Sequence, residues 1–259
     1  MARRRGAAHR RRRGRFSALL KLVCAALILG AAGAALTVFF KVQHITVEGA
    51  QRYGDAEIVA ASGIEREDNL FLLNKYSVAQ TIFDTLPYVE EARIHRTLPD
   101  TIVITVRECS AAAAVETAEG CWLISEQGKL LECVSAAPKG CPLVRGLVPL
   151  DPAPSAQLTA KAGRESDVEM LLSLLRAARG RSMLADISRI DLDDAALIRM
   201  SYLGRFTVKL PWDAEPDTIL RGMEDVAKNE LESNQTGEIN FMNLASKGWV
   251  NFIPGEVEE

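Results

Sequence analysis

General acid–base chemistry would have to come from three histidines or from one acidic cluster in this 259-residue chain. The histidines are His9, His44 and His95, and none has a serine or cysteine nucleophile beside it in a recognisable motif. Asp191, Asp193 and Asp194 follow a predicted strand, where acidic residues usually face solvent. The chain lacks the G-x-S-x-G, H-E-x-x-H, Walker and G-x-G-x-x-G motifs. Catalysis is therefore not supported, and no cofactor, metal or small-molecule substrate is expected.

Four of the five cysteines could do redox chemistry, because they lie close together at Cys109, Cys121, Cys133 and Cys141. A three-residue hairpin loop at residues 126–128 would place Cys121 opposite Cys133. Such a pair outside the cytoplasm can form a disulfide, and free thiols are the alternative. The spacing lacks the C-x-x-C pairs that are typical of zinc sites.

Charge is distributed very unevenly along the chain. Residues 1–47 contain ten basic side chains and no acidic one, whereas the remaining 21 basic and 34 acidic residues leave residues 48–259 with a formal charge of −13. The arginines predicted to determine topology are Arg10, Arg11, Arg12, Arg13 and Arg15. An arginine cluster can also bind nucleic acid, but beside an apolar helix it is typical of a topology signal that contacts anionic lipid.

The stretch from residue 22 to residue 40 carries no charge and is rich in Ala, Leu and Val. As a helix it would be about 28 Å long, which matches the hydrocarbon core of a bilayer. The positive-inside rule then predicts a cytoplasmic N-terminus and an extracytoplasmic C-terminal part. A cleaved signal peptide and a mitochondrial transit peptide are the alternatives. The run is longer than an ordinary signal core and apolar all round, which favours an anchor.

The elements beyond this run predict an α+β protein. Residues 42–48 alternate as a strand, a short helix ends at Ser62-Gly63, and a second helix opens with a capping box at Ser77 and Gln80. Two more strands follow at 89–96 and 101–107, giving a β-α-α-β-β order. The second half predicts a mostly antiparallel β domain with helices. Its predicted elements are a hairpin at 122–131, helices at 167–179 and 216–229, and strands at 187–192, 196–202, 205–210, 237–242 and 249–253.

Three phrases carry a resemblance to a known family. They are ITVEG at 45–49, LPYVEEA at 86–92 and RTLPDTIVITV at 96–106. Their order and spacing after an apolar segment resemble the POTRA domain of the FtsQ and DivIB bacterial cell-division proteins, and the second half is similar to the β domain of that family. The phrase at 239–241 departs from the family, which often has Ile-Asp-Leu there.

The resemblance implies a non-catalytic divisome scaffold in the cell membrane at the division septum. It would link cytoplasmic to extracytoplasmic division proteins, including septal peptidoglycan machinery, through FtsL and FtsB or DivIC partners. The family's final strands bind a partner strand by β-augmentation. The partner-binding residues it suggests here are Ile239, Phe241, Trp249 and Phe252, although core packing would also explain Phe241 and Trp249.

The expected organisation has five parts. They are a basic cytoplasmic tail at 1–21, a transmembrane helix at 22–40, a POTRA domain at 41–108, a β domain at 109–254 and a short tail at 255–259. Two other classes of function stay open. One is a membrane-anchored cell-wall enzyme, and the other is a POTRA-containing transport or assembly protein.

Overall fold

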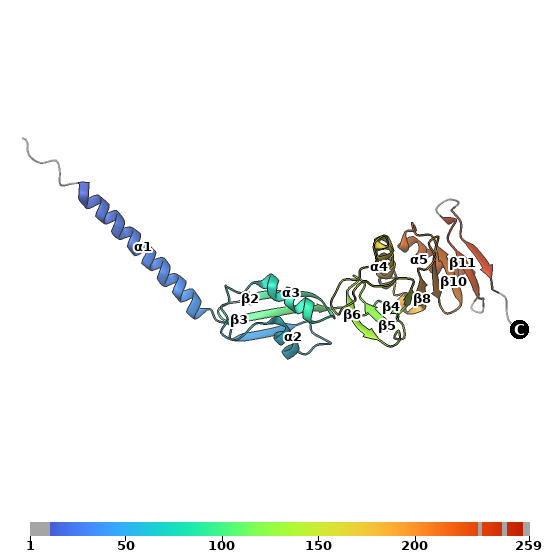
Figure 1. Ribbon diagram of the computed structural model, residues 1–259, viewed down its shortest axis with the longest axis horizontal. Helices are drawn as coiled ribbons and strands as arrows, with labels where there is room; N and C mark the ends of the chain where they lie inside the picture. Colours follow the sequence, from blue (N-terminus) through green and yellow to red (C-terminus); the bar gives the residue numbers. More distant parts are fainter. Residues whose placement is uncertain (1–10, 233–234, 245–247, 256–259) are drawn as a thin grey trace, which may run out of the picture. The chain divides into compact units, whose positions relative to one another are not determined.

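The computed structural model describes the chain except residues 1–10, 233–234, 245–247 and 256–259 (Figure 1). It divides into two compact units. The first comprises Met1–Thr81 and Ala92–Val106, and the second comprises Ile82–Glu91 and Arg107–Glu259.

The first unit begins with helix α1, Arg11–Phe39. Among the described residues, no helix combines the length and the apolar character that a membrane crossing requires. Within the predicted span at 22–40, the structure does not describe the side chains of residues 32 and 34–38. It also does not describe Arg10 or the side chains of residues 11–18. The predicted span and its arginine flank therefore stay predictions.

The region after α1 has the predicted β-α-α-β-β order. Its elements are β1 His44–Glu48, α2 Asp55–Ser62, α3 Lys75–Thr85, β2 Val89–Thr97 and β3 Thr101–Glu108. The sheet order is β1-β3-β2, and β1 runs parallel to β3. Ile102, Ile104 and Val106 are buried, as their alternation predicts.

One helix start was predicted wrongly. Helix α3 begins at Lys75, ahead of the predicted capping box at Ser77 and Gln80. Asn74 caps it instead, because its Oδ1 accepts the backbone N–H groups of Tyr76 at 3.1 Å and Ser77 at 3.3 Å. The predicted stop of α2 is confirmed, since Gly63 adopts a left-handed φ of 65°.

The second unit contains a nine-stranded sheet in the order β12-β11-β10-β9-β8-β7-β4-β5-β6. The strands are β4 Ala113–Thr117, β5 Gly120–Ile124, β6 Leu130–Val134, β7 Leu143–Arg145, β8 Ile187–Asp191, β9 Ile198–Tyr202, β10 Phe206–Leu210, β11 Gly237–Asn240 and β12 Asn251–Pro254. The sheet is mixed, because β4–β7, β7–β8 and β10–β11 pair in parallel whereas the other neighbours are antiparallel. Strand β4 was not predicted.

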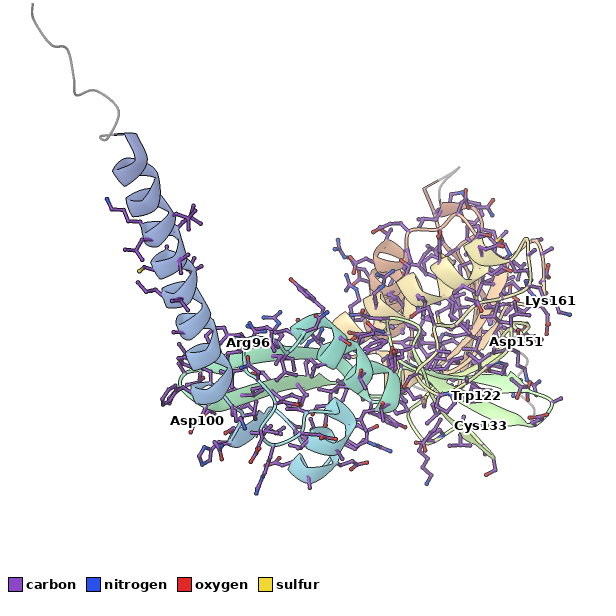
Figure 2. All side chains as sticks on the ribbon, turned by 60° about the vertical axis from the view of Figure 1, so that its left-hand side comes forward. Arg96, Asp100, Trp122, Cys133, Asp151 and Lys161 are labelled. Carbon is purple, nitrogen blue, oxygen red and sulfur yellow. The ribbon has the colours of Figure 1, made fainter. Side chains whose placement is uncertain are left out.

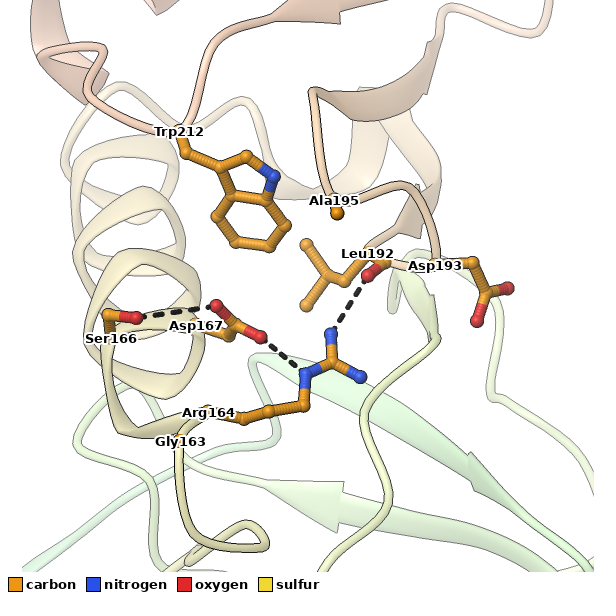
Figure 3. Close-up of a pocket in the computed structure, with 8 residues that line it drawn as sticks. All are labelled: Gly163, Arg164, Ser166, Asp167, Leu192, Asp193, Ala195 and Trp212. Carbon is orange, nitrogen blue, oxygen red and sulfur yellow. Dashed lines mark hydrogen bonds and ion pairs between the residues drawn. The ribbon is translucent and has the colours of Figure 1, made fainter.

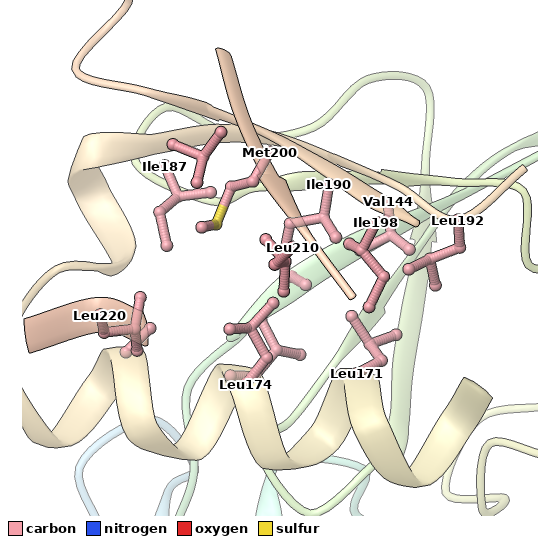
Figure 4. Close-up of a cluster of buried hydrophobic side chains, with 14 of the residues drawn as sticks. Val144, Leu171, Leu174, Ile187, Ile190, Leu192, Ile198, Met200, Leu210 and Leu220 are labelled. Carbon is pink, nitrogen blue, oxygen red and sulfur yellow. The ribbon is translucent and has the colours of Figure 1, made fainter. Parts of the chain in front are cut away.

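Helices cover one face of this sheet. They are α4 Glu165–Gly180, the 3-10 turn η1 Leu184–Asp186, α5 Pro216–Asp225 and the π-helical turn η2 Val226–Glu230. Leu171 and Leu174 of α4 pack against Ile190, Ile198 and other strand residues that face inward (Figure 4). This layer of buried aliphatic side chains is the main core of the second unit.

Candidate functional site

The outer strand β12 is the part of the second unit most suited to binding another chain. It pairs antiparallel with β11, and Gly255 N–H donates to the Thr236 carbonyl at 2.8 Å. Successive strand residues direct their backbone groups to opposite sides, so the N–H and C=O of Phe252 point away from β11. No described strand pairs with that side. β12 therefore presents an open edge to which a further strand can add.

The four side chains predicted to bind a partner at this edge differ in exposure. Ile239 and Phe241 are fully buried in the core, so neither side chain is presented to a partner. Phe252 is half-buried and packs edge-to-face on Phe206, with ring centroids 6.2 Å apart. Trp249 is 44% exposed, and Ile253, which was not predicted, is 48% exposed. Strand alternation could have identified Ile253, because it follows Phe252 on the opposite face.

A pocket of about 360 Å³ lies at the start of α4 (Figure 3). Arg164 is its central charged group, but its guanidinium is engaged by Asp167 and by the carbonyls of Gly146 and Leu192. Trp212 Nε1 donates to the Asp194 carbonyl at 3.1 Å. These contacts tie α4 to the ends of β7 and β8, so the pocket is held together by structural hydrogen bonds and contains no activated nucleophile among its described residues.

The acidic cluster beside this pocket caps turns of the backbone. Asp191 accepts the N–H of Asp193 at 3.0 Å, and Asp194 accepts the N–H of Ala196 at 2.9 Å. Hydrogen bonds from Ala196 N–H and Arg199 hold the pKa of Asp194 below its ordinary value. A general acid at neutral pH needs the opposite shift, so Asp194 is not suited to that role.

The two histidines that the structure describes lie on different strands, His44 on β1 and His95 on β2. His44 is exposed and lies 3.6 Å from Asp100, measured from Nδ1 to Oδ2. His95 is exposed on β2, and His9 lies outside the described residues.

The predicted pairing of Cys121 with Cys133 is wrong in register. The loop is as expected, because Ser125 N–H donates to the Lys129 carbonyl. However, the pairing is irregular between Trp122 and Ile124, so Cys121 pairs with Val134. Cys133 pairs with Trp122, and these two residues are labelled in Figure 2. A shift of one residue turns a side chain to the other face. Cys121 is accordingly buried, Cys133 is exposed, and all five cysteines are free thiols.

Lys129 is a buried charged residue that the sequence analysis did not identify as a candidate. It is only 3% exposed, and its Nζ donates to the carbonyls of Phe83 at 2.7 Å, Leu86 at 3.2 Å and Val89 at 2.8 Å. It also lies 3.5 Å from the centroid of the Phe83 ring. These carbonyls lie at and just beyond the end of α3, where helix carbonyls lack partners and a cation is favourable. All of these residues belong to the second unit.

The stability of the second unit should depend on pH through Lys129. Burial lowers the pKa of this amine from 10.5 to about 8. Between these values the unfolded chain holds a proton that the folded chain has released, so Lys129 makes the free energy of unfolding rise with pH in that window. We expect the difference in unfolding free energy between wild type and Lys129→Met to be larger at pH 9.5 than at pH 7.5, as measured by urea titration. An unchanged difference would mean that Lys129 titrates like a lysine in water.

Comparison with known proteins adds the family context. Residues 40–108 match the POTRA domain of the FtsQ type. The chain is 28% identical over 179 residues to cell division protein FtsQ of Syntrophotalea carbinolica, covering 68% of this chain and 61% of that protein. It is 34% identical over 89 residues to FtsQ of Corynebacterium glutamicum, covering 34% and 40% of the two chains. It is also 31% identical over 94 residues to cell division protein DivIB of Clostridium acetobutylicum, covering 36% and 37%. The matches thus span between 37% and 61% of these relatives' own length.

Proposed function

Because this chain is a member of the FtsQ/DivIB family and carries an FtsQ-type POTRA domain, we propose that it is a non-catalytic scaffold of bacterial cell division. It links cytoplasmic to extracytoplasmic division proteins at the septum by protein–protein binding. The observation that carries the proposal is the match of residues 40–108 together with a 179-residue similarity that continues beyond this domain.

Anchoring in the cell membrane by residues 22–40 is part of the proposal. The run has no charged residue, and residues 1–47 contain ten basic side chains and no acidic one. Large side chains of α1 support an apolar environment, since Leu22, Leu27 and Leu29 are each at least 67% exposed. The arginine-rich flank stays in the cytoplasm and residues 41–259 lie outside it, with the POTRA domain at 41–108 and the β domain at 109–254.

The partners proposed for the β domain are division proteins of the FtsL and FtsB/DivIC type. The open edge of β12 supports this, because its outward backbone groups can pair with a partner strand. Trp249 and Phe252 flank the edge and are the side chains that a bound strand would contact. Ile239 and Phe241 support the edge from the core.

Two experiments in the host bacterium test the scaffold role. One depletes the chain from the cells, and the other captures the proteins that bind it. We expect cells depleted of the chain to grow as filaments with incomplete septa. The tagged full-length chain, solubilised from membranes, should recover small single-pass division proteins of the FtsL and FtsB/DivIC type. Division at normal cell length after depletion would reject the role. Cell-wall hydrolysis by the purified chain, abolished by a point substitution, would favour the enzyme alternative instead.

A further inference from the structure

The face of the large sheet opposite α4 and α5 carries a second feature, a polar hollow near the β9–β10 turn. It has a volume of about 390 Å³. Its polar lining includes Ser188, Arg189, Ser201, Arg205 and Thr207. Ile190, Met200 and Val208 point into the core, so their neighbours Arg189, Ser201 and Thr207 must point to the outer face. The hollow is therefore built on regular strands, not on loops alone.

The cations elsewhere on this outer face are already matched by carboxylates. Arg145 lies 2.7 Å from Glu116, Arg199 lies 2.7 Å from Asp194, and Lys209 lies 2.6 Å from Glu238. Within the part of the chain that the structure describes, neither Arg189 nor Arg205 forms an ion pair. A hollow with two guanidinium groups that no described carboxylate neutralises is unexpected in a region whose formal charge is −13 between residues 48 and 259.

Arg205 is held in place by the backbone. Its Nη1 donates to the carbonyls of Glu232 at 2.8 Å and Gln235 at 3.1 Å, and its Cζ lies 4.4 Å from the centroid of the Phe206 ring. Arg189 on β8 pairs with Ser201 on β9, which in turn pairs with Thr207 on β10. Arg205 lies in the turn just before β10, and β8 and β10 are separated by β9, so these strands are about 10 Å apart. Ser201 and Thr207 line the hollow together with the two arginines.

We propose that this hollow is a docking site for an acidic segment of a partner protein, whose Asp or Glu carboxylate binds Arg189 and Arg205. A planar guanidinium matches a carboxylate with two parallel N–H···O bonds, and such charge-assisted bonds are stronger than neutral ones. The hydroxyls of Ser188, Ser201 and Thr207 supply additional donors around it. The hollow lies on the sheet face and the β12 edge lies at the sheet's side, so this surface is separate from the proposed strand-addition site and does not rest on it.

The test uses fluorescence anisotropy of a fluorescein-labelled peptide, acetyl-Glu-Gly-Glu-Gly-Glu-amide, titrated with the full-length chain in a neutral detergent. We expect saturable binding that added salt weakens. Arg189→Gln should weaken it at least fivefold. Arg199→Gln removes the same charge from the same face but from a matched pair, and it should change the affinity less than twofold. A peptide with Gln in place of Glu should not bind.

Each other outcome overturns the proposal. If Arg189→Gln and Arg199→Gln lowered the affinity for the peptide equally, the peptide would bind by general electrostatic attraction to this face. Absence of saturable binding would mean that the hollow has no such ligand. If inorganic phosphate or a soluble peptidoglycan fragment competes at lower concentration than unlabelled peptide, the ligand is not an acidic peptide. If binding appears only in a chain ending at Gly255, the chain's own residues Glu256, Glu258 and Glu259 are the occupant.

Discussion

A Lys129→Met variant is expected to lose about 2–4 kcal/mol of unfolding free energy at neutral pH, because three carbonyl oxygens lose a buried cationic donor at once. The carbonyls of Phe83, Leu86 and Val89 all accept from the Lys129 Nζ, and the substitution also removes the cation–π contact with Phe83. Urea unfolding followed by tryptophan fluorescence measures the loss. Trp122, Trp212 and Trp249 all lie in the second unit, so the signal reports on the unit that contains Lys129.

Lys139→Met is the matched control, because Lys139 is exposed and the substitution is chemically identical. It should change the unfolding free energy by less than about 0.5 kcal/mol. If Lys129→Met were as stable as this control, the three hydrogen bonds would contribute nothing net, and the desolvation cost of the buried amine would equal their benefit.

Phe252→Pro is expected to weaken binding of the proposed FtsB/DivIC-type partner by more than tenfold relative to Phe252→Ala. Proline removes the N–H that points to the open side of β12, and it leaves the hydrogen bonds to β11 intact because those come from neighbouring residues. Loss of one backbone hydrogen bond, together with a locked φ, accounts for a change of that size. Titration of the purified partner with each full-length variant measures the two affinities.

Phe252→Ala is the necessary comparison, because both substitutions remove the ring that packs on Phe206. Only the proline variant also removes the outward N–H. Equal affinities for the two variants would exclude strand addition at β12, even if both bind more weakly than wild type. The unfolding curves of the two variants should coincide, which checks that a difference in affinity does not reflect a difference in stability.

Much of the POTRA domain could be predicted because the sequence patterns of its strands and helices are local. The alternation of Ile102, Ile104 and Val106 marks a strand with one buried face, and Gly63 marks the end of a helix because its left-handed φ suits glycine. These patterns depend on residues two to four positions apart. The order of elements followed from them, and the phrases at 45–49, 86–92 and 96–106 then indicated the family that the comparisons support.

Strand β4 escaped prediction because its residues carry no alternating pattern. Ala113, Ala114 and Val115 are all fully buried, and β4 lies inside the sheet between β5 and β7. A run of alanines is equally compatible with a helix. It becomes a strand by pairing with β5 on one side and with Leu143 and Val144 of β7 on the other.

The pairing of the two cysteines and the burial of the predicted partner-binding residues also depended on contacts between distant parts of the chain. Counting outward from the hairpin loop assumed regular pairing, and one irregularity between Trp122 and Ile124 moved Cys121 and Cys133 to opposite faces. Ile239 and Phe241 were plausible contacts on a terminal strand. Packing of α5 made them core, as the closeness of Gly222 to the Phe241 ring illustrates.

The sequence by itself determined the charge asymmetry, the apolar run, the β-α-α-β-β order and the resemblance to the FtsQ/DivIB family, because each depends on residue types at short separations. The tertiary structure alone decided that β12 has an open edge, that Arg189 and Arg205 line one hollow without a carboxylate, and that Lys129 meets the end of α3. Those three features bring together residues from separate strands and helices. Their contacts depend on pairing register and helix packing, which no local pattern of residues specifies.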